Sequence, residues 1–267
     1  MRYRSKTVAL ASMVLMLGAC SSHLQSTSGT SYLARYDRLG YNAAGPAPGE
    51  NGDVVNVDAD VRRIASVEPR LEFPARIGLA RVSYQGLTAI PGDEAMIWQE
   101  TLEDIGEAYG EFVPVSPLIA SMVAGPAPAN GDRTAAIIAD IRRGAARQHL
   151  DYVFVYEVGS SSREKSNAVS LADLTIVGMF VLPTRNVEVE ASASGLLLDV
   201  RNGYPYATLT GHAEKSSLSR VVSSQSTRRD LADTAEERAV ADLAGEVAGT
   251  LKGLRDRAAS NAESIGE

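Results

Sequence analysis

The chain has 267 residues, of which 45% are hydrophobic and 22% charged, and its formal net charge is −7. An acidic chain is poorly suited to attract nucleic acid electrostatically, so we expect no nucleic-acid partner. The single cysteine excludes a disulfide within the chain and a zinc site built from several thiolates.

The amino terminus has the features of a secretory signal peptide. Three basic residues, Arg2, Arg4 and Lys6, precede an apolar run over residues 8–17. This run is too short to span a bilayer as a helix, and small residues follow it. We therefore predict that residues 1–19 are a signal peptide.

Leu17-Gly18-Ala19-Cys20 resembles the lipobox of bacterial lipoproteins, in which the cysteine is acylated and becomes the first residue after cleavage. The resemblance implies a lipid carrying palmitate-type chains on Cys20, with the membrane as a partner. Ser21 and Ser22 follow without an aspartate, and the enterobacterial sorting pattern then implies the outer membrane and a domain facing the periplasm. The alternative is an ordinary signal peptide beside an incidental cysteine.

Residues 20–53 are rich in Ser, Gly, Pro, Ala and Asn. Such a segment buries too little apolar surface to offset the entropy of ordering, and we interpret it as a flexible tether. Tyr32 and Leu33 are exceptions to this polar composition. The alternative is therefore that this part of the segment docks on the domain or on a partner. Residues 54–267 then form a single periplasmic domain.

The spacing of apolar residues predicts alternating helices and strands in this domain. Residues 152–156 are continuously apolar, which indicates a central strand covered on both faces, and a polar loop is expected at 159–167. Asn202-Gly203 predicts a tight hairpin turn. The predicted helices cover residues 54–66, 93–109 (ending at Gly110), 130–149 and 230–257, and the predicted strands cover residues 75–84, 112–116, 152–158, 171–182, 187–200 and 204–212.

This order predicts an α/β (α+β) fold with a single mixed sheet flanked by helices. The topology is β-α-β-α-β followed by an antiparallel β-meander and a carboxy-terminal helix. Between 187 and 194, small apolar residues alternate with Glu188, Glu190 and serines, which predicts one face exposed to water.

Residues suited to catalysis are few. His149 ends a helix and His212 lies on a strand, and their spacing matches no zinc-binding motif. Glu188 and Glu190 have the spacing of a solvent-facing strand rather than of an acid–base pair. No nucleophile elbow, phosphate loop or dinucleotide fingerprint is present in the sequence. We expect no enzyme activity, no catalytic residue, no metal and no small-molecule cofactor.

Two tyrosines are candidates for partner binding. Tyr204 and Tyr206 flank Pro205 beside the predicted turn, where aromatic rings can be exposed to an interface. The long terminal strands also offer a sheet edge to another chain.

Three segments resemble a group of envelope proteins that includes the TolB amino-terminal domain, CsgG, PelC and LpoB. They are Arg76 to Val82 as a first strand, Arg147 to Val155 as a helix-to-strand step, and Leu196 to Gly203 as a hairpin. Members of this group are assembly platforms or pores. The resemblance implies a non-catalytic lipoprotein that binds another envelope protein or itself during envelope biogenesis or export of a surface structure. The alternatives are a ring-forming secretion-channel subunit and a cell-wall hydrolase.

Overall fold

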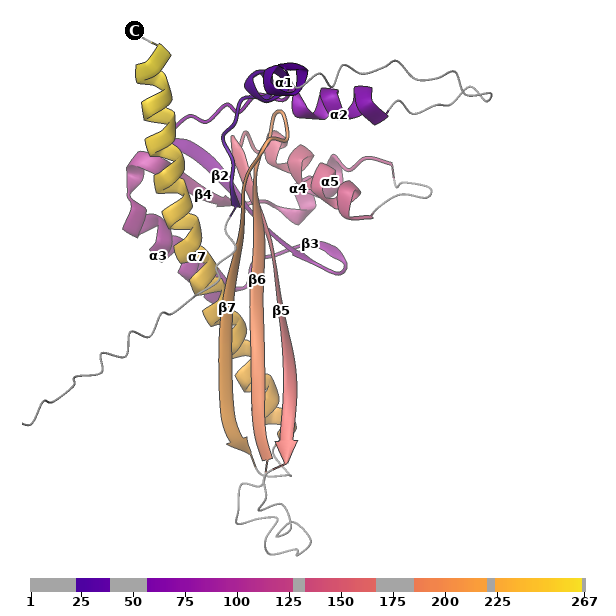
Figure 1. Cartoon of the computed structure of the whole chain (residues 1–267). Coiled ribbons are helices and arrows are strands. Elements are labelled where there is room, and N and C mark those ends of the chain that lie inside the picture. The colour runs from indigo at the N-terminus through magenta and orange to yellow at the C-terminus, as the bar shows by residue number, and fades with distance from the viewer. Residues whose placement is uncertain (1–22, 39–56, 127–132, 167–184, 220–223, 266–267) are drawn as a thin grey trace, which may run out of the picture.

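The computed structural model describes residues 23–38, 57–126, 133–166, 185–219 and 224–265. The signal peptide, Cys20 and the strand expected at 171–182 lie outside these residues. The described segments form one mixed sheet with helices on both faces (Figure 1), which confirms the predicted fold class.

The sheet has seven strands in the order β1-β7-β6-β5-β2-β3, with β4 also paired to β2. β2 is parallel to β4 and β5, whereas β6 and β7 continue from β5 as an antiparallel meander. The strands are β1 (His23–Leu24), β2 (Ala75–Ser83), β3 (Gly86–Thr88), β4 (Gly110–Pro114), β5 (Tyr152–Ser166), β6 (Arg185–Asp199) and β7 (Pro205–Ser219).

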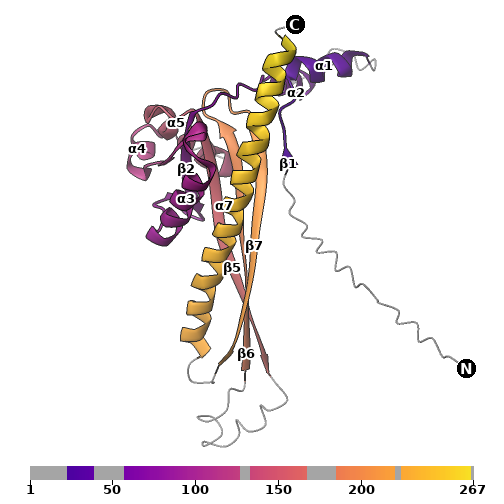
Figure 2. The same cartoon turned by 90° about the vertical axis from the view of Figure 1, so that its left-hand side faces the viewer.

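Helices cover the two faces of the sheet unequally (Figure 2). α3 and the long α7 pack on one face, and α4 and α5 pack on the other, over the body of the domain only. The helices are α1 (Gly29–Arg38), α2 (Val57–Ala65), α3 (Gly92–Ile105), α4 (Pro117–Met122), α5 (Arg133–Arg147) and α7 (Ser224–Ile265), with a 3-10 turn at Glu107–Tyr109. No helix in the described segments, α7 included, is both long and apolar enough to cross a bilayer.

The first half of β5 is buried on both sides, as its apolar run predicts. Phe154 and Tyr156 point toward α3, where their rings lie 5.6 and 5.3 Å from the ring of Trp98. Val153 and Val155 point to the opposite face and join the cluster that contains Ile141 of α5. Alternate residues of one strand therefore serve two separate cores.

Local sequence signals misplace two boundaries and miss one short helix. The loop predicted at 159–167 is strand as far as Ser166, because β6 pairs with β5 along its whole length. The helix predicted to reach Tyr109 ends at Gly106, whose positive φ of 83° breaks it before the 3-10 turn. The short α4 was not predicted; it begins where Ser116 accepts a hydrogen bond from the Ile119 amide.

The structure also differs from the predicted tether over residues 20–53. Residues 23–38 contain β1, which pairs with β7, and α1, which contacts α2. The Thr30 amide and hydroxyl both donate to the Glu68 carboxylate, at 2.7 and 2.6 Å, and these hydrogen bonds lower the pKa of Glu68. Polar composition alone suggested a coil, but backbone pairing and side-chain hydrogen bonds attach this segment to the domain.

Candidate functional site

Three long strands leave the body of the domain together (Figure 1). β2 pairs with β5 only as far as Glu157, whereas the pairing of β5, β6 and β7 continues. Residues 158–166, 185–193 and 211–219 therefore project beyond the body as a three-stranded sheet, which we call the ribbon. Each of its parent strands is 15 residues long, far above the usual length.

α7 covers one face of the ribbon. The small apolar residues of the alternating run, Val189, Ala191 and Ala193, are buried on this face, as their alternation predicts. Gly211 lies directly against the helix: a Cβ atom there would stand 2.4 Å from the Ala239 carbonyl oxygen. Because these side chains are small, α7 packs closely against the strands. The ribbon is therefore a single layer of strands supported by one helix.

The other face of the ribbon is polar, and no helix in the described segments covers it. We call this the open face; its exposed residues are Gly159, Ser161, Glu190, Ser192, His212 and Glu214. Glu190 is exposed as predicted, while the side chain of Glu188 lies outside the described residues.

The two edges of the ribbon differ. On β7, the His212 amide donates to Asp242 of α7 at 3.0 Å, so the helix occupies part of that edge. On β5, no strand among the described residues pairs with the outer edge beyond Glu157. Unpaired amide and carbonyl groups on an extended strand are a template for adding a strand from another chain.

A groove of about 560 Å³ opens at the base of the ribbon, between the sheet, the turn after β2 and the start of α5. Tyr84 stands at this turn with 90% of its side chain exposed. The Arg133 guanidinium carbon lies 5.7 Å from the Tyr84 ring centroid, in cation–π geometry. The remaining lining combines apolar and polar side chains, among them Val82, Ile137, Glu157, Ser194, Leu196 and Thr210. The groove, the open face and the β5 edge form a continuous candidate interaction site.

The residues weighed for catalysis do not converge on a shared site. His149 is exposed in the link between α5 and β5, whereas His212 and Glu190 lie on neighbouring strands of the open face. A further carboxylate, Asp151, has structural partners: it accepts from the Arg76 amide at 2.9 Å and pairs with Arg201 at 3.7 Å. Within the described segments, no group of three His, Cys, Asp or Glu side chains is placed to hold a metal.

The expectation that the Tyr204 and Tyr206 rings are exposed beside the turn is wrong. They are 3% and 0% exposed, because β1 and the segment before β2 cover them. The Tyr206 hydroxyl accepts from the Arg70 amide at 2.8 Å and donates to Asp199 at 3.3 Å, and burial raises its pKa. The Tyr204 hydroxyl donates to the Thr27 carbonyl at 2.8 Å. Both rings belong to the core.

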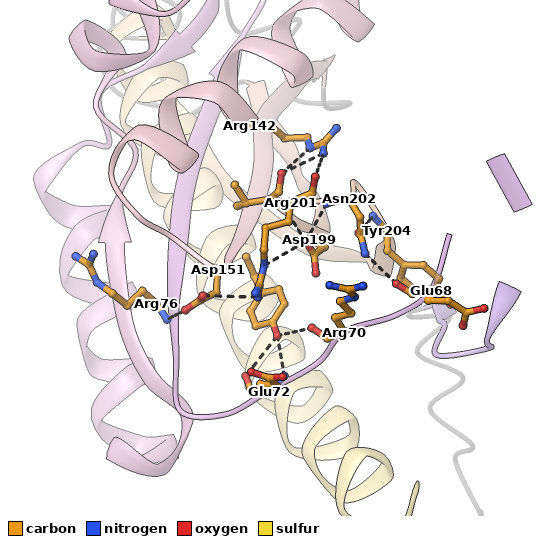
Figure 3. A network of polar contacts seen from close by, with 12 residues as sticks. Glu68, Arg70, Glu72, Arg76, Arg142, Asp151, Asp199, Arg201, Asn202 and Tyr204 are labelled. Carbon is orange, nitrogen blue, oxygen red and sulfur yellow. Dashed lines mark hydrogen bonds and ion pairs between the residues drawn. The ribbon is translucent and has the colours of Figure 1, made fainter. Parts of the chain in front are cut away.

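Asp199 organises the predicted hairpin turn (Figure 3). Its carboxylate is fully buried and accepts the amides of Arg201 and Asn202, at 2.8 and 3.1 Å. The Arg142 guanidinium of α5 donates to the carbonyl of Arg201 at 3.2 Å, and Gly203 adopts a positive φ of 76°. Local hydrogen bonding thus explains why the Asn-Gly signal succeeded.

A buried polar triad links β2, α3 and β5. Arg81 donates to both carboxylate oxygens of Glu94, at 2.9 and 3.0 Å, and the Tyr156 hydroxyl donates to the same carboxylate at 2.8 Å. Burial and the charge of Glu94 raise the pKa of Tyr156. Sequence reasoning missed this triad; an arginine inside an apolar strand was its one local signal.

No family model matches the chain, and no curated protein matches it in sequence. Among solved structures, the chain is similar to the PelC dodecamer from Paraburkholderia phytofirmans at 14% identity, covering 67% of this chain and 86% of PelC, with a TM-score of 0.32.

Two further similar structures are a minor lipoprotein and a carboxy-terminal domain of LpoB. A minor lipoprotein from Acinetobacter baumannii matches at 11% identity over 68% of this chain and 94% of its own, with a TM-score of 0.30. The LpoB carboxy-terminal domain from Salmonella enterica matches at 13% identity over 54% and 82%, with a TM-score of 0.20. At such identities and TM-scores, these matches stand as similarities and no function passes from them to this chain.

Proposed function

We propose that this chain is a non-catalytic lipoprotein, held in the outer membrane by lipid on Cys20, whose periplasmic domain binds another envelope protein or a second copy of itself. Its role lies in envelope biogenesis or in export of a surface structure. The lipobox-like sequence supports the anchor, and the candidate interaction site supports the binding role.

The observation that carries the binding role is the edge of β5 that no strand among the described residues pairs with, beside a polar face that no described helix covers. Nine residues of β5, 158–166, lie beyond the reach of β2. An exposed edge of this length tends to be covered by a partner, because unpaired strands otherwise promote aggregation. The exposed Tyr84 ring next to this edge adds the kind of aromatic anchor that interfaces favour.

Site-specific photocrosslinking in living cells tests this role. A photoreactive amino acid at Ser161 or Tyr84 is expected to give discrete adducts, because both side chains are exposed at the candidate interaction site. The matched control is Glu100, an exposed residue on α3 outside that site, which is expected to give none. Adducts are measured by immunoblotting and mass spectrometry. Equal yields at all three positions, or no adduct at Ser161 and Tyr84, contradict the proposal.

The same experiment separates a different partner from self-association. Adducts at multiples of the chain mass indicate contact between copies, and a closed ring seen in native mass or electron microscopy of detergent-extracted protein supports a ring-forming channel subunit. This second candidate is favoured by one feature: the ribbon has two edges, so each copy can contact two neighbours.

The anchor itself has a direct test. Cys20→Ser is expected to abolish incorporation of labelled palmitate and to leave unprocessed precursor, because the modified atom is the cysteine sulfur. Fractionation and intact mass check both effects. Ser22→Ala serves as the control, with labelling retained. Normal processing of the wild-type chain without any lipid on Cys20 rules out the anchor.

A further inference from the structure

A second groove, of about 610 Å³, lies between α1, α2, β1 and the turn that connects β6 to β7. Its lining is largely apolar and includes Leu24, Tyr32, Val61, Ile64, Val67 and Tyr204. We call it the α1–α2 groove. It shares no lining residue with the groove at the base of the ribbon.

The rim of the α1–α2 groove exposes apolar side chains from both helices. Val61 and Ile64 lie one turn apart on α2 and are 50% and 58% exposed, and Tyr32 of α1 is also exposed. Arg35 and Arg63 line the same groove, and Arg63 also forms an exposed ion pair with Asp60 of the same helix at 2.6 Å, so that charged groups flank the apolar ones. Apolar and aromatic groups edged by arginine are typical of surfaces that lie at a lipid–water interface.

The position of this groove in the chain favours lipid over a protein occupant. His23 and Leu24 line it, and only Ser21 and Ser22 separate His23 from Cys20. Three residues span at most about 10 Å when fully extended. A lipid on Cys20 therefore keeps this part of the domain within about 10 Å of the membrane surface, instead of several nanometres away on a long tether. This step rests on the proposed anchor.

The ribbon points to the opposite end of the molecule. β6 begins at Arg185, at the far end of the ribbon, and ends at Asp199, beside the turn that lines the α1–α2 groove. Fifteen residues of strand span roughly 45 to 50 Å. Both views show α1 and α2 at one end and the ribbon extending away from them (Figures 1 and 2).

We propose that the rim of the α1–α2 groove rests on the lipid surface that holds Cys20, with its apolar side chains in the interface and its arginines beside lipid phosphates. The ribbon is then directed away from that membrane, and the candidate interaction site faces the periplasmic space. The lipid on Cys20 then makes the strong contact with the membrane, and the apolar side chains and the arginines of the rim add weaker contacts.

Fluorescence quenching by spin-labelled lipids tests this orientation. The lipid consumes the thiol of Cys20, so that an introduced cysteine is the sole free thiol of the full-length lipidated protein. Ile64→Cys, Ser161→Cys and Leu118→Cys are each labelled with bimane and reconstituted into vesicles of phosphatidylethanolamine and phosphatidylglycerol carrying doxyl lipid. Leu118 is the matched control, because it is apolar and 77% exposed but lies on α4, outside the α1–α2 groove.

We expect doxyl lipid to quench bimane several-fold more strongly at position 64 than at positions 118 and 161. Quenching that is strongest at 161, equal at all three positions or absent from position 64 overturns the proposed orientation. Shielding of position 64 from aqueous iodide without quenching by lipid also overturns it and points to a second copy or another protein. The mass of the amino-terminal peptide reports lipidation separately, so that failure of the anchor is distinguished from failure of the orientation.

Discussion

Replacing Glu94 with alanine is expected to lower the free energy of unfolding by about 3–5 kcal/mol, because the change leaves a buried charge without its partner. The Glu94 side chain is 8% exposed and the Arg81 side chain 18%, so both charges are largely shielded from solvent. The Tyr156 hydroxyl loses its acceptor at the same time. Urea unfolding of the domain, followed by the fluorescence of the adjacent Trp98, measures the loss.

Two control variants make this result specific. Glu100→Ala changes an exposed glutamate on the same helix and is expected to stay within about 0.5 kcal/mol of the wild type. Glu94→Gln keeps an acceptor for Tyr156 but removes the charge opposite Arg81. Its loss of unfolding free energy is expected to lie between those of Glu100→Ala and Glu94→Ala. A loss below about 1 kcal/mol for Glu94→Ala would show that the triad contributes little.

The second large effect is expected from Gly211→Ala, which should destabilise the domain by roughly 1–3 kcal/mol through overpacking. The added Cβ would stand 2.4 Å from the Ala239 carbonyl oxygen and 2.5 Å from the Leu243 amide nitrogen. These are backbone atoms of α7, so no side-chain rotation relieves the clash, and the helix must move away from the ribbon. Chemical denaturation at equilibrium measures this loss of stability.

Gly159→Ala is the matched control for this change. Gly159 is also a ribbon glycine, but a Cβ atom there meets nothing within 4 Å, because it points to the open face. We expect a change of no more than about 0.5 kcal/mol. If both alanines cost the same, strand propensity rather than contact with α7 explains the effect, and the packing account of the ribbon fails.

The two substitutions affect different parts of the domain, the body and the ribbon. Glu94 lies where α3 meets β2 and β5, whereas Gly211 lies where α7 meets the ribbon. A variant at Gly211 that still folds is also expected to give weaker photocrosslinking from Ser161, because the strands lose the helix that backs them. Because α7 packs on one face only, the opposite face of the ribbon is covered by no helix of the described segments.

Local signals succeeded where neighbouring residues make the structure. The hairpin at Asn202 and Gly203 was predicted because the turn needs a positive φ, and the central strand because residues 152–156 are apolar on both faces. The alternation around Val189 correctly separated the face under α7 from the face toward water. Each of these features depends on backbone preference or on a period within one strand.

Local signals failed where residues distant in the sequence determine the structure. Residues 159–166 are polar and resemble a loop in sequence, yet residues 185–192 of β6 pair with them and hold them as strand. Tyr206 looked exposed beside its turn, yet the backbone of Arg70, far away in the sequence, covers its hydroxyl. The composition of segment 23–38 predicted a tether, yet its strand β1 pairs with β7.

The sequence by itself determined the fold class, the order of the elements and the expectation of a lipid at Cys20, because composition, periodicity and a short motif encode them locally. Only the tertiary structure decided which surfaces are open, since exposure depends on what else packs there. It moved the candidate interaction site from Tyr204 and Tyr206 to the ribbon and its groove. It also placed the α1–α2 groove within a few residues of the predicted anchor.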